Sequence, residues 1–411
     1  MTRVFAKIAT NISEDFKGWL HELQYHEPST VERRKKNMSA IGDIFRAALG
    51  FFIKPRLQNS EVLYIFEGIR YKEYMTVFRT ETIVVVGSHI ERDFAKRHGY
   101  KFCWSYPMVC AINFKVTKGL NLFLNRQIKL WVQELSRFNK IIFFLYEDTQ
   151  PLGCYFVHIG RFLKTETNTE TNSVCIQHGY FCKRNSKIRR DGELSDINLV
   201  WDDSQIEVIG CKRSAAFEIG LPYVAVAKPT NALIVVLVGT GMYAGQYSEY
   251  EVYGQSINAF ADIKAALIQS FGLKVFYRPH PNEWISPNNV AKMNKHLSPL
   301  DDFDKVGRLN GPRALFIGTI SSLLYEAGVA GHFVARLKLD GDPISIFNVD
   351  FEFGTQEIDA LVKWVSTLAT SSRVDTGELA SKEDCPTVKF VSALHSAKLI
   401  DADADAEFQK F

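Results

Sequence analysis

One imidazole stands between two prolines in the stretch RPHP, which is formed by Arg278, Pro279, His280 and Pro281 after the apolar run KVFY. Each proline fixes its own φ angle and lacks a backbone N–H donor, so the strand has to end here. A histidine held rigidly at a strand end can donate a hydrogen bond to a departing phosphate. The alternative is that the histidine is an ordinary polar residue of the core or surface.

A pair of serines supplies a second feature directed at anions. Ser321 and Ser322 follow the apolar run ALFIGT, which ends at Thr319, and they open an expected helix over residues 321–331. Backbone N–H groups at the start of a helix attract anions, and the serine hydroxyls add further donors. The alternative, in which Ser321 only caps the helix, is compatible with this role.

Two adjacent carboxylates, Glu147 and Asp148, follow the apolar run KIIFFLY. Paired carboxylates at a strand end are costly unless they are exposed or hydrogen-bonded. One of them could accept a proton from an attacking hydroxyl, and the alternative is a solvated strand end. The motifs QHG and GTG also follow apolar runs and add these candidates: Gln177, His178, Gly239, Thr240 and Gly241.

Short apolar runs alternate with stretches of helical period throughout the chain. Near-continuous apolar strands are typical of a parallel sheet with helices on both faces. In such open sheets ligands bind at the carboxyl ends of the strands, where the candidate side chains fall. The expected strands of the first half are 61–68, 82–88, 140–148, 173–179 and 198–203, and the helices include 91–99 and 120–138.

The same alternation starts again after residues 220–231, where Pro222 and Pro229 are typical of a linker. A chain of 411 residues suits two domains better than one. We therefore predict an α/β protein with two Rossmann-like, doubly wound domains facing a central cleft. The expected parts are a first domain over 1–225, a second over 226–354, and a helical segment over 355–411 that packs back near the junction.

Composition excludes several classes of partner. Lys and Arg number 49 against 46 Asp and Glu, so there is no broad basic field for a nucleic acid. The seven cysteines are scattered without a CxxC pair, which is typical of reduced thiols in a cytoplasmic protein. No apolar run approaches the ~18 residues of a membrane span. The basic run at 183–190 leaves peripheral attachment to the inner face of the cytoplasmic membrane open.

The strand-RPHP motif followed by strand-GT-x-SS-x-x-x-E-A resembles the inverting GT-B glycosyltransferases of bacteria that use CMP-activated sugars. These are the sialyltransferases and polysialyltransferases with HP and SS motifs, and more distantly the Kdo-transferases of capsule and lipopolysaccharide biosynthesis. The resemblance covers residues 232–331 well and the first half of the chain more thinly. It implies a GT-B fold, with the acceptor bound by the first domain and the nucleotide sugar by the second.

The resemblance also implies roles on the donor side. The HP histidine and the serine motif of that family meet the CMP phosphate, which implicates His280, Ser321 and Ser322. Glu326 would contact the ribose hydroxyls, or would be an ordinary glutamate on the helix surface. The neighbouring residues at strand ends complete the expected donor site: Gly239, Thr240, Gly241, Arg278, Pro281 and Thr319. The sequence does not determine to which face of the sheet the side chain of Arg278 points.

The family's catalytic base is an acidic residue of a D/E-D-G motif at a strand end of the first domain. The stretch YEDTQ stands in that place with Thr149 where the family has glycine, so Asp148 and Glu147 both remain candidates. The QHG motif resembles that of capsule-type and polyol-phosphate transferases, which would put Gln177 and His178 on the acceptor side.

The implied reaction is an inverting transfer of sialic acid or a Kdo-like sugar from a CMP donor to a hydroxyl of a surface glycan. The partners would be the nucleotide sugar and an oligosaccharide or glycolipid acceptor. No cofactor and no metal are expected, because His280 and the helix start would supply the electrophilic help. Alternatives are another GT-B donor, such as a CDP-polyol phosphate or a UDP- or GDP-sugar, and a catalytically inactive nucleotide-binding protein.

Overall fold

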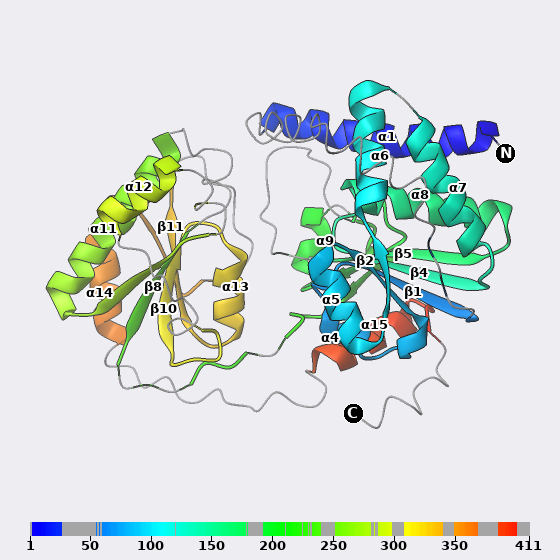
Figure 1. The fold of residues 1–411 in the computed structure, drawn as a ribbon. Helices are drawn as coiled ribbons and strands as arrows, with labels where there is room; N and C mark the ends of the chain where they lie inside the picture. The colour runs from blue at the N-terminus through cyan, green and yellow to red at the C-terminus, as the bar shows by residue number, and fades with distance from the viewer. Residues whose placement is uncertain are drawn as a thin grey trace. The chain divides into compact units, whose positions relative to one another are not determined.

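The chain forms two compact units. The first comprises Met1–His178, Lys187–Pro222 and Glu383–Phe411, and the second comprises Gly179–Ser186 and Tyr223–Lys382. The computed structural model (Figure 1) describes residues 2–26, 55, 57, 60–119, 121–177, 179, 192–209, 211–223, 225–228, 230, 232–239, 251–280, 283, 287–297, 308–339, 349–368 and 385–400.

The first unit is built on a seven-stranded sheet in the order β3-β2-β1-β4-β5-β6-β7, with every neighbouring pair parallel. The chain order reverses between β1 and β4, which makes the carboxyl ends of these two strands the switch point of the sheet. The strands are β1 Val62–Glu67, β2 Ile83–Gly87, β3 Lys101–Trp104, β4 Lys140–Leu145, β5 Glu170–Ile176, β6 Ile197–Val200 and β7 Ala216–Glu218.

Helices cover both faces of this sheet, as Figure 1 shows, which explains why strands such as β2 are buried along their whole length. Alternate strand residues point to opposite faces and so contribute to two separate core clusters. One face carries α1 Thr2–His26, α6 Tyr106–Lys118, α7 Leu122–Leu135 and α8 Pro151–Glu166. The other face carries α4 Lys72–Met75, α5 His89–His98 and α15 Pro386–Ser396. A short helix, α9 Ser204–Ile209, follows β6.

The second unit is built on a five-stranded parallel sheet in the order β12-β11-β10-β8-β9. Helices α11, α12 and α14 pack on one face and α13 on the other (Figure 1). The strands are β8 Ile234–Val238, β9 Lys274–Arg278, β10 Ala314–Gly318, β11 Phe333–Lys338 and β12 Phe351–Gly354. The helices are α11 Glu251–Phe271, α12 Pro287–His296, α13 Ser322–Val329 and α14 Ile358–Leu368.

The α/β class and the two doubly wound parallel sheets confirm the prediction from the apolar runs. The units divide between Pro222 and Tyr223, close to the expected boundary after residue 225. The segment expected over 355–411 is split between the units, because α14 packs on the second sheet and α15 on the first. Among the described residues, no helix is both long and apolar enough to cross a membrane.

Candidate functional site

The carboxyl ends of β8, β9 and β10 lie at one edge of the second sheet. Val238 of β8 is in register with Arg278 of β9 on one side and with Gly318 of β10 on the other. Because neighbouring strands lie about 4.8 Å apart, the Cα atoms of Arg278 and Gly318 are separated by about 10 Å. The segments that carry His280 and the serine pair therefore leave the sheet at the same edge, on either side of β8.

Arg278 lies on the face of the sheet that α13 covers. Its neighbour Tyr277 belongs to the core cluster of the opposite face, under α11. Val238, in register with Arg278, packs instead with Leu324 and Ala327 of α13. Since side chains alternate along a strand, Arg278 points to the α13 side.

The serine pair stands at the start of α13. The side chain of Ser321 caps the helix by accepting a hydrogen bond from the backbone N–H of Leu323 at 3.3 Å. A hydroxyl has one donor as well as two acceptor positions, so a capping serine can still donate to a ligand oxygen. Both serines are half-buried, and the buried Leu324 and Ala327 fix the helix on the sheet.

A buried carboxylate that sequence reasoning missed holds the backbone of His280 in place. Glu283 is fully buried and accepts hydrogen bonds from the backbone N–H of His280 and from the hydroxyl of Tyr277. A Cβ atom on Gly239 would lie 2.0 Å from Oε2 of Glu283, so the glycine leaves the space that this carboxylate occupies. A glutamate soon after the second proline was the available signal.

The imidazole of His280 is half-buried, and its pKa is lowered from 6.5 by burial and by the positive charge of Arg278. The ring is therefore neutral at pH 7 and keeps one N–H that can donate a hydrogen bond. Thr319 is buried, and its carbonyl accepts a hydrogen bond from Nε of Arg336 at 3.3 Å. In this structure Thr319 directly follows β10 and does not present an open surface.

Glu326 lies one helical turn beyond Ser322 on α13 and is half-buried. Its carboxylate accepts a hydrogen bond from the hydroxyl of Tyr223. Burial and the charge of Glu326 raise the pKa of Tyr223, while the charge of Arg278 lowers it. The carboxylate of Glu326 and the positive charge of Arg278 thus act on the same phenol in opposite directions.

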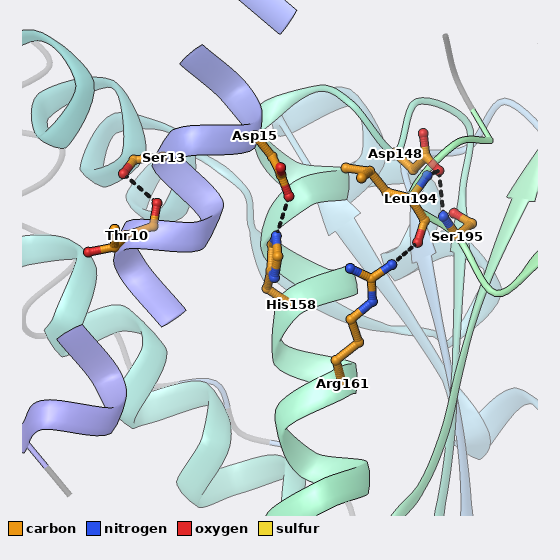
Figure 2. Close-up of polar contacts among 8 residues, drawn as sticks. All are labelled: Thr10, Ser13, Asp15, Asp148, His158, Arg161, Leu194 and Ser195. Atoms are coloured by element: carbon orange, nitrogen blue, oxygen red, sulfur yellow. Dashed lines mark hydrogen bonds and ion pairs between the residues drawn. The ribbon is translucent and has the colours of Figure 1, made fainter. Parts of the chain in front are cut away.

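The structure corrects the expectation that Asp148 is an accessible base. Its side chain is 0% exposed, and its two oxygens accept hydrogen bonds from the backbone N–H groups of Gly192 at 2.8 Å, Leu194 at 2.9 Å and Ser195 at 2.7 Å. Figure 2 shows this carboxylate beside Leu194 and Ser195, with Arg161 of α8 donating to the carbonyl of Leu194. Burial raises the pKa of Asp148 in spite of these bonds. Asp148 ties a loop to the end of β4.

Glu147 and Glu67 meet at the switch point of the first sheet. Glu147 follows β4 and is half-buried, whereas Glu67 ends β1, the neighbouring strand, and is only 8% exposed. Burial and the charge of Glu147 raise the pKa of Glu67 well above its usual value, although the backbone at Tyr146 and Glu147 donates hydrogen bonds to it. Sequence reasoning missed Glu67, even though it ends an expected strand.

Gln177 is also buried and engaged within the first unit. Its side-chain amide donates to Gln205 at 2.7 Å, and its side-chain oxygen accepts from the backbone N–H of Trp201 at 2.7 Å. The structure therefore gives Gln177 the role of joining the ends of β5 and β6, in place of the expected contact with an acceptor. Four other predicted site residues lie outside the described residues: His178, Thr240, Gly241 and Pro281.

Comparison with known proteins yields no matching family model and no significant sequence match to a characterised protein. Solved structures with a distant likeness include a UDP-GlcNAc 2-epimerase from Methanocaldococcus jannaschii, at 10% identity and a TM-score of 0.47, over 81% of this chain and 99% of that one. The wall teichoic acid polymerase TagF, soaked with CDPG, shows 11% identity and a TM-score of 0.45, over 96% of this chain and 99% of that one. A glycotransferase of kitacinnamycin shows 10% identity and a TM-score of 0.46, over 83% of this chain and 99% of that one. Likenesses this distant do not assign an activity.

Proposed function

We propose that this chain is a GT-B glycosyltransferase that binds a nucleotide-activated sugar at the carboxyl edge of the second sheet. The observation that carries the proposal is the convergence of three groups suited to a phosphate. Arg278 lies on the α13 face of β9, His280 follows it two residues later, and the start of α13 at Ser321 and Ser322 stands two strands away at the same edge. A helix start, a cation and a neutral imidazole N–H are all complementary to an anion.

The donor that we propose is a CMP-activated sugar, sialic acid or Kdo-like, because the HP and serine motifs match those of the CMP-dependent transferases. The acceptor would be a hydroxyl of a bacterial oligosaccharide or glycolipid, bound by the first unit. Its site would lie at the ends of β1 and β4, which form the switch point of that sheet. A cytoplasmic location, with peripheral attachment to the membrane, belongs to the same proposal.

In the proposed mechanism the acceptor oxygen attacks the anomeric carbon while the bond from that carbon to the phosphate oxygen breaks on the opposite face. The configuration therefore inverts. The acceptor proton passes to the carboxylate of Glu147, because both oxygens of Asp148 are already engaged by the backbone. Charge develops on the departing phosphate, where His280, Arg278 and the start of α13 would stabilise it. The scheme requires neither a metal nor a cofactor.

Thermal unfolding of the full chain with CMP, CDP, UDP and GDP tests the choice of donor. CMP should raise the melting temperature, since a ligand at 100 times its Kd stabilises the folded state by about 2.7 kcal/mol. His280→Ala should weaken this stabilisation and lower the rate of CMP release in a transfer assay by about 10²–10³. His296→Ala, a change at an exposed histidine of α12, should alter neither quantity.

Each other outcome has a distinct meaning. Stabilisation by UDP or GDP alone would replace the CMP-sugar by one of the other sugar donors, and stabilisation by CDP alone would favour a polyol-phosphate donor. Stabilisation by CMP without turnover in the presence of sugar acceptors would favour an inactive nucleotide-binding protein. A chain that responds to none of the four nucleotides would contradict the proposal as a whole.

A further inference from the structure

The segment that follows the division of the units after Pro222 is hydrogen-bonded along α13. Tyr223, the first residue after that division, donates its hydroxyl hydrogen to the carboxylate of Glu326 near the middle of the helix. A few residues later, the backbone N–H of Ala227 donates to the carbonyl of Ala330, at the end of the helix, at 2.7 Å. The segment thus runs beside the helix and is hydrogen-bonded to it at two places, one of them through a side chain.

The hydrogen bond between Tyr223 and Glu326 does more than fasten the segment to α13. Tyr223 is 37% exposed, and Glu326 is half-buried, so the pair lies at the surface of the unit. A hydrogen bond to an ionised carboxylate is stronger than one between neutral groups and holds the acceptor in a single orientation. A carboxylate can accept about four hydrogen bonds, so the bond from the phenol is compatible with further bonds from a ligand.

The surroundings of Glu326 indicate what kind of ligand this is. Ser322 lies four residues earlier on the same side of α13, which corresponds to about 6 Å along the helix axis. Arg278 supplies a positive charge close to Tyr223. An anion-attracting helix start at one end and a hydrogen-bond acceptor one turn away match a ribose 5′-phosphate, in which the sugar ring separates the phosphate from the vicinal hydroxyls.

We propose that Tyr223 is a positioning residue that holds Glu326 ready to accept hydrogen bonds from the ribose hydroxyls of the donor nucleotide. This inference rests on the proposed function and adds the residue that prepares the ribose contact. A glutamate side chain without a fixed partner loses rotamer freedom when it binds. Tyr223 imposes that order before the ligand arrives, so the nucleotide gains the full benefit of the contact.

A purely structural role for Tyr223 makes a different prediction. If the phenol only fastened the segment to α13, its removal would weaken the binding of all nucleotides by the same factor. If it orients Glu326, its removal weakens only those nucleotides that carry the ribose hydroxyls. The dependence of affinity on those hydroxyls is therefore the discriminating measurement.

The test is a titration of the full chain with CMP, 2′-deoxy-CMP and 3′-deoxy-CMP, followed by calorimetry. Wild type should bind at least one deoxynucleotide about 10-fold more weakly than CMP, as expected for the loss of a hydrogen bond to a charged acceptor. Tyr223→Phe should bind CMP about 5-fold more weakly and the same deoxynucleotide with little change. The ratio of the two affinities should therefore fall toward one.

Two further variants define the comparison. Tyr106→Phe removes the hydroxyl of a tyrosine of the first unit that is 40% exposed, and it should keep the wild-type ratio. Glu326→Gln should lower the ratio as Tyr223→Phe does, and the double variant should add little to either single change. If Tyr223→Phe does not fold, the same ratio measured on Glu326→Gln decides the question, and an unchanged ratio overturns the proposal.

Two results, one with Tyr223→Phe and one with the wild-type protein, would overturn the inference and leave the proposed function standing. One is an equal loss of affinity for CMP and for the deoxynucleotides. The other is a wild-type protein that binds CMP and both deoxynucleotides equally well, because Glu326 would then make no ribose contact. A wild-type protein that binds no cytidine nucleotide would remove the proposed function and this inference together.

Discussion

At the scale of single residues, buried carboxylates act as anchors for the backbone. Asp148 binds three N–H groups of the loop after residue 191, and Glu283 binds the N–H of His280 together with the hydroxyl of Tyr277. Each of these acids holds a segment next to a strand end. Glu147, which is half-buried, is the acid of the first sheet that we propose as the base.

The variants Asp148→Asn and Glu147→Gln distinguish the structural role of Asp148, which anchors the backbone, from the catalytic role proposed for Glu147. The asparagine amide would turn a donor toward backbone N–H groups, so we expect a loss of about 2–3 kcal/mol in the free energy of unfolding. Glu147→Gln should leave stability within about 0.5 kcal/mol and lower the rate of transfer by about 10²–10⁴. Urea unfolding and a transfer assay measure the two effects. A stable but inactive Asp148→Asn would instead support Asp148 as the base.

His332 gives the second unit a defined dependence on pH. This fully buried imidazole accepts at Nδ1 from the backbone N–H of Ala314 at 3.1 Å, while its Nε2 lies 2.9 Å from the carbonyl of Leu309. Acceptance at Nδ1 requires the neutral ring. Burial lowers the pKa of His332 below its usual 6.5, and the charge of Arg313 lowers it further.

We therefore expect stability to fall as the pH drops below 6.5, because His332 then binds a proton in the unfolded chain but not in the folded chain. The slope is about 1.36 kcal/mol per pH unit for one such histidine, between the folded pKa and 6.5. Above pH 6.5 this contribution is constant. Urea unfolding of His332→Gln between pH 5 and 8 should show a shallower slope, and His296→Gln, a change at an exposed residue of α12, should keep the wild-type slope. Equal slopes in both variants would contradict the assignment.

At the scale of elements, the end of β8 and the side chain of Glu283 share one small space. Gly239→Ala places a methyl group 2.0 Å from Oε2 of Glu283 and 2.8 Å from the hydroxyl of Tyr277. Either the carboxylate or the backbone at Gly239 must move, and we expect a cost of about 1–3 kcal/mol in stability. Because His280 depends on Glu283 for its position, CMP binding should weaken as well.

A glycine in open surroundings serves as the control for this change. Gly254 lies within α11, and a Cβ there would meet only Nζ of Lys292 at 3.8 Å. Gly254→Ala should therefore stabilise the chain by about 0.5–1 kcal/mol, the usual helix preference for alanine. Thermal unfolding and calorimetry measure both variants. A stable Gly239→Ala with unchanged CMP affinity would show that the turn tolerates the methyl group.

At the scale of the whole molecule, the sequence predicted what depends on local pattern. Apolar runs of strand length, alternating with helical stretches, were sufficient for two doubly wound sheets and for the strand ends where candidate residues gather. The burial of Asp148 and Gln177 was not predictable in this way. Their partners at 192–195 and 201–205 lie far along the chain, and only folding brings them together.

The same limit explains the terminal helices. The pattern at 355–411 predicted helices but not their partners, and α14 and α15 pack on different sheets. The ring of Phe390 in α15 stacks on Tyr74, with ring centroids 4.2 Å apart, although more than three hundred residues separate them in the chain. Helical period identifies an apolar face but not the surface that it covers.

The placement of α15 bears on the order in which the protein can be made. Synthesis proceeds from the amino end, and domains generally fold as units once their residues have emerged. One core cluster of the first unit includes Phe390, Leu394 and Leu399, which leave the ribosome after the whole of the second unit. The second unit is complete in sequence before them, so it can fold while the first unit still lacks α15.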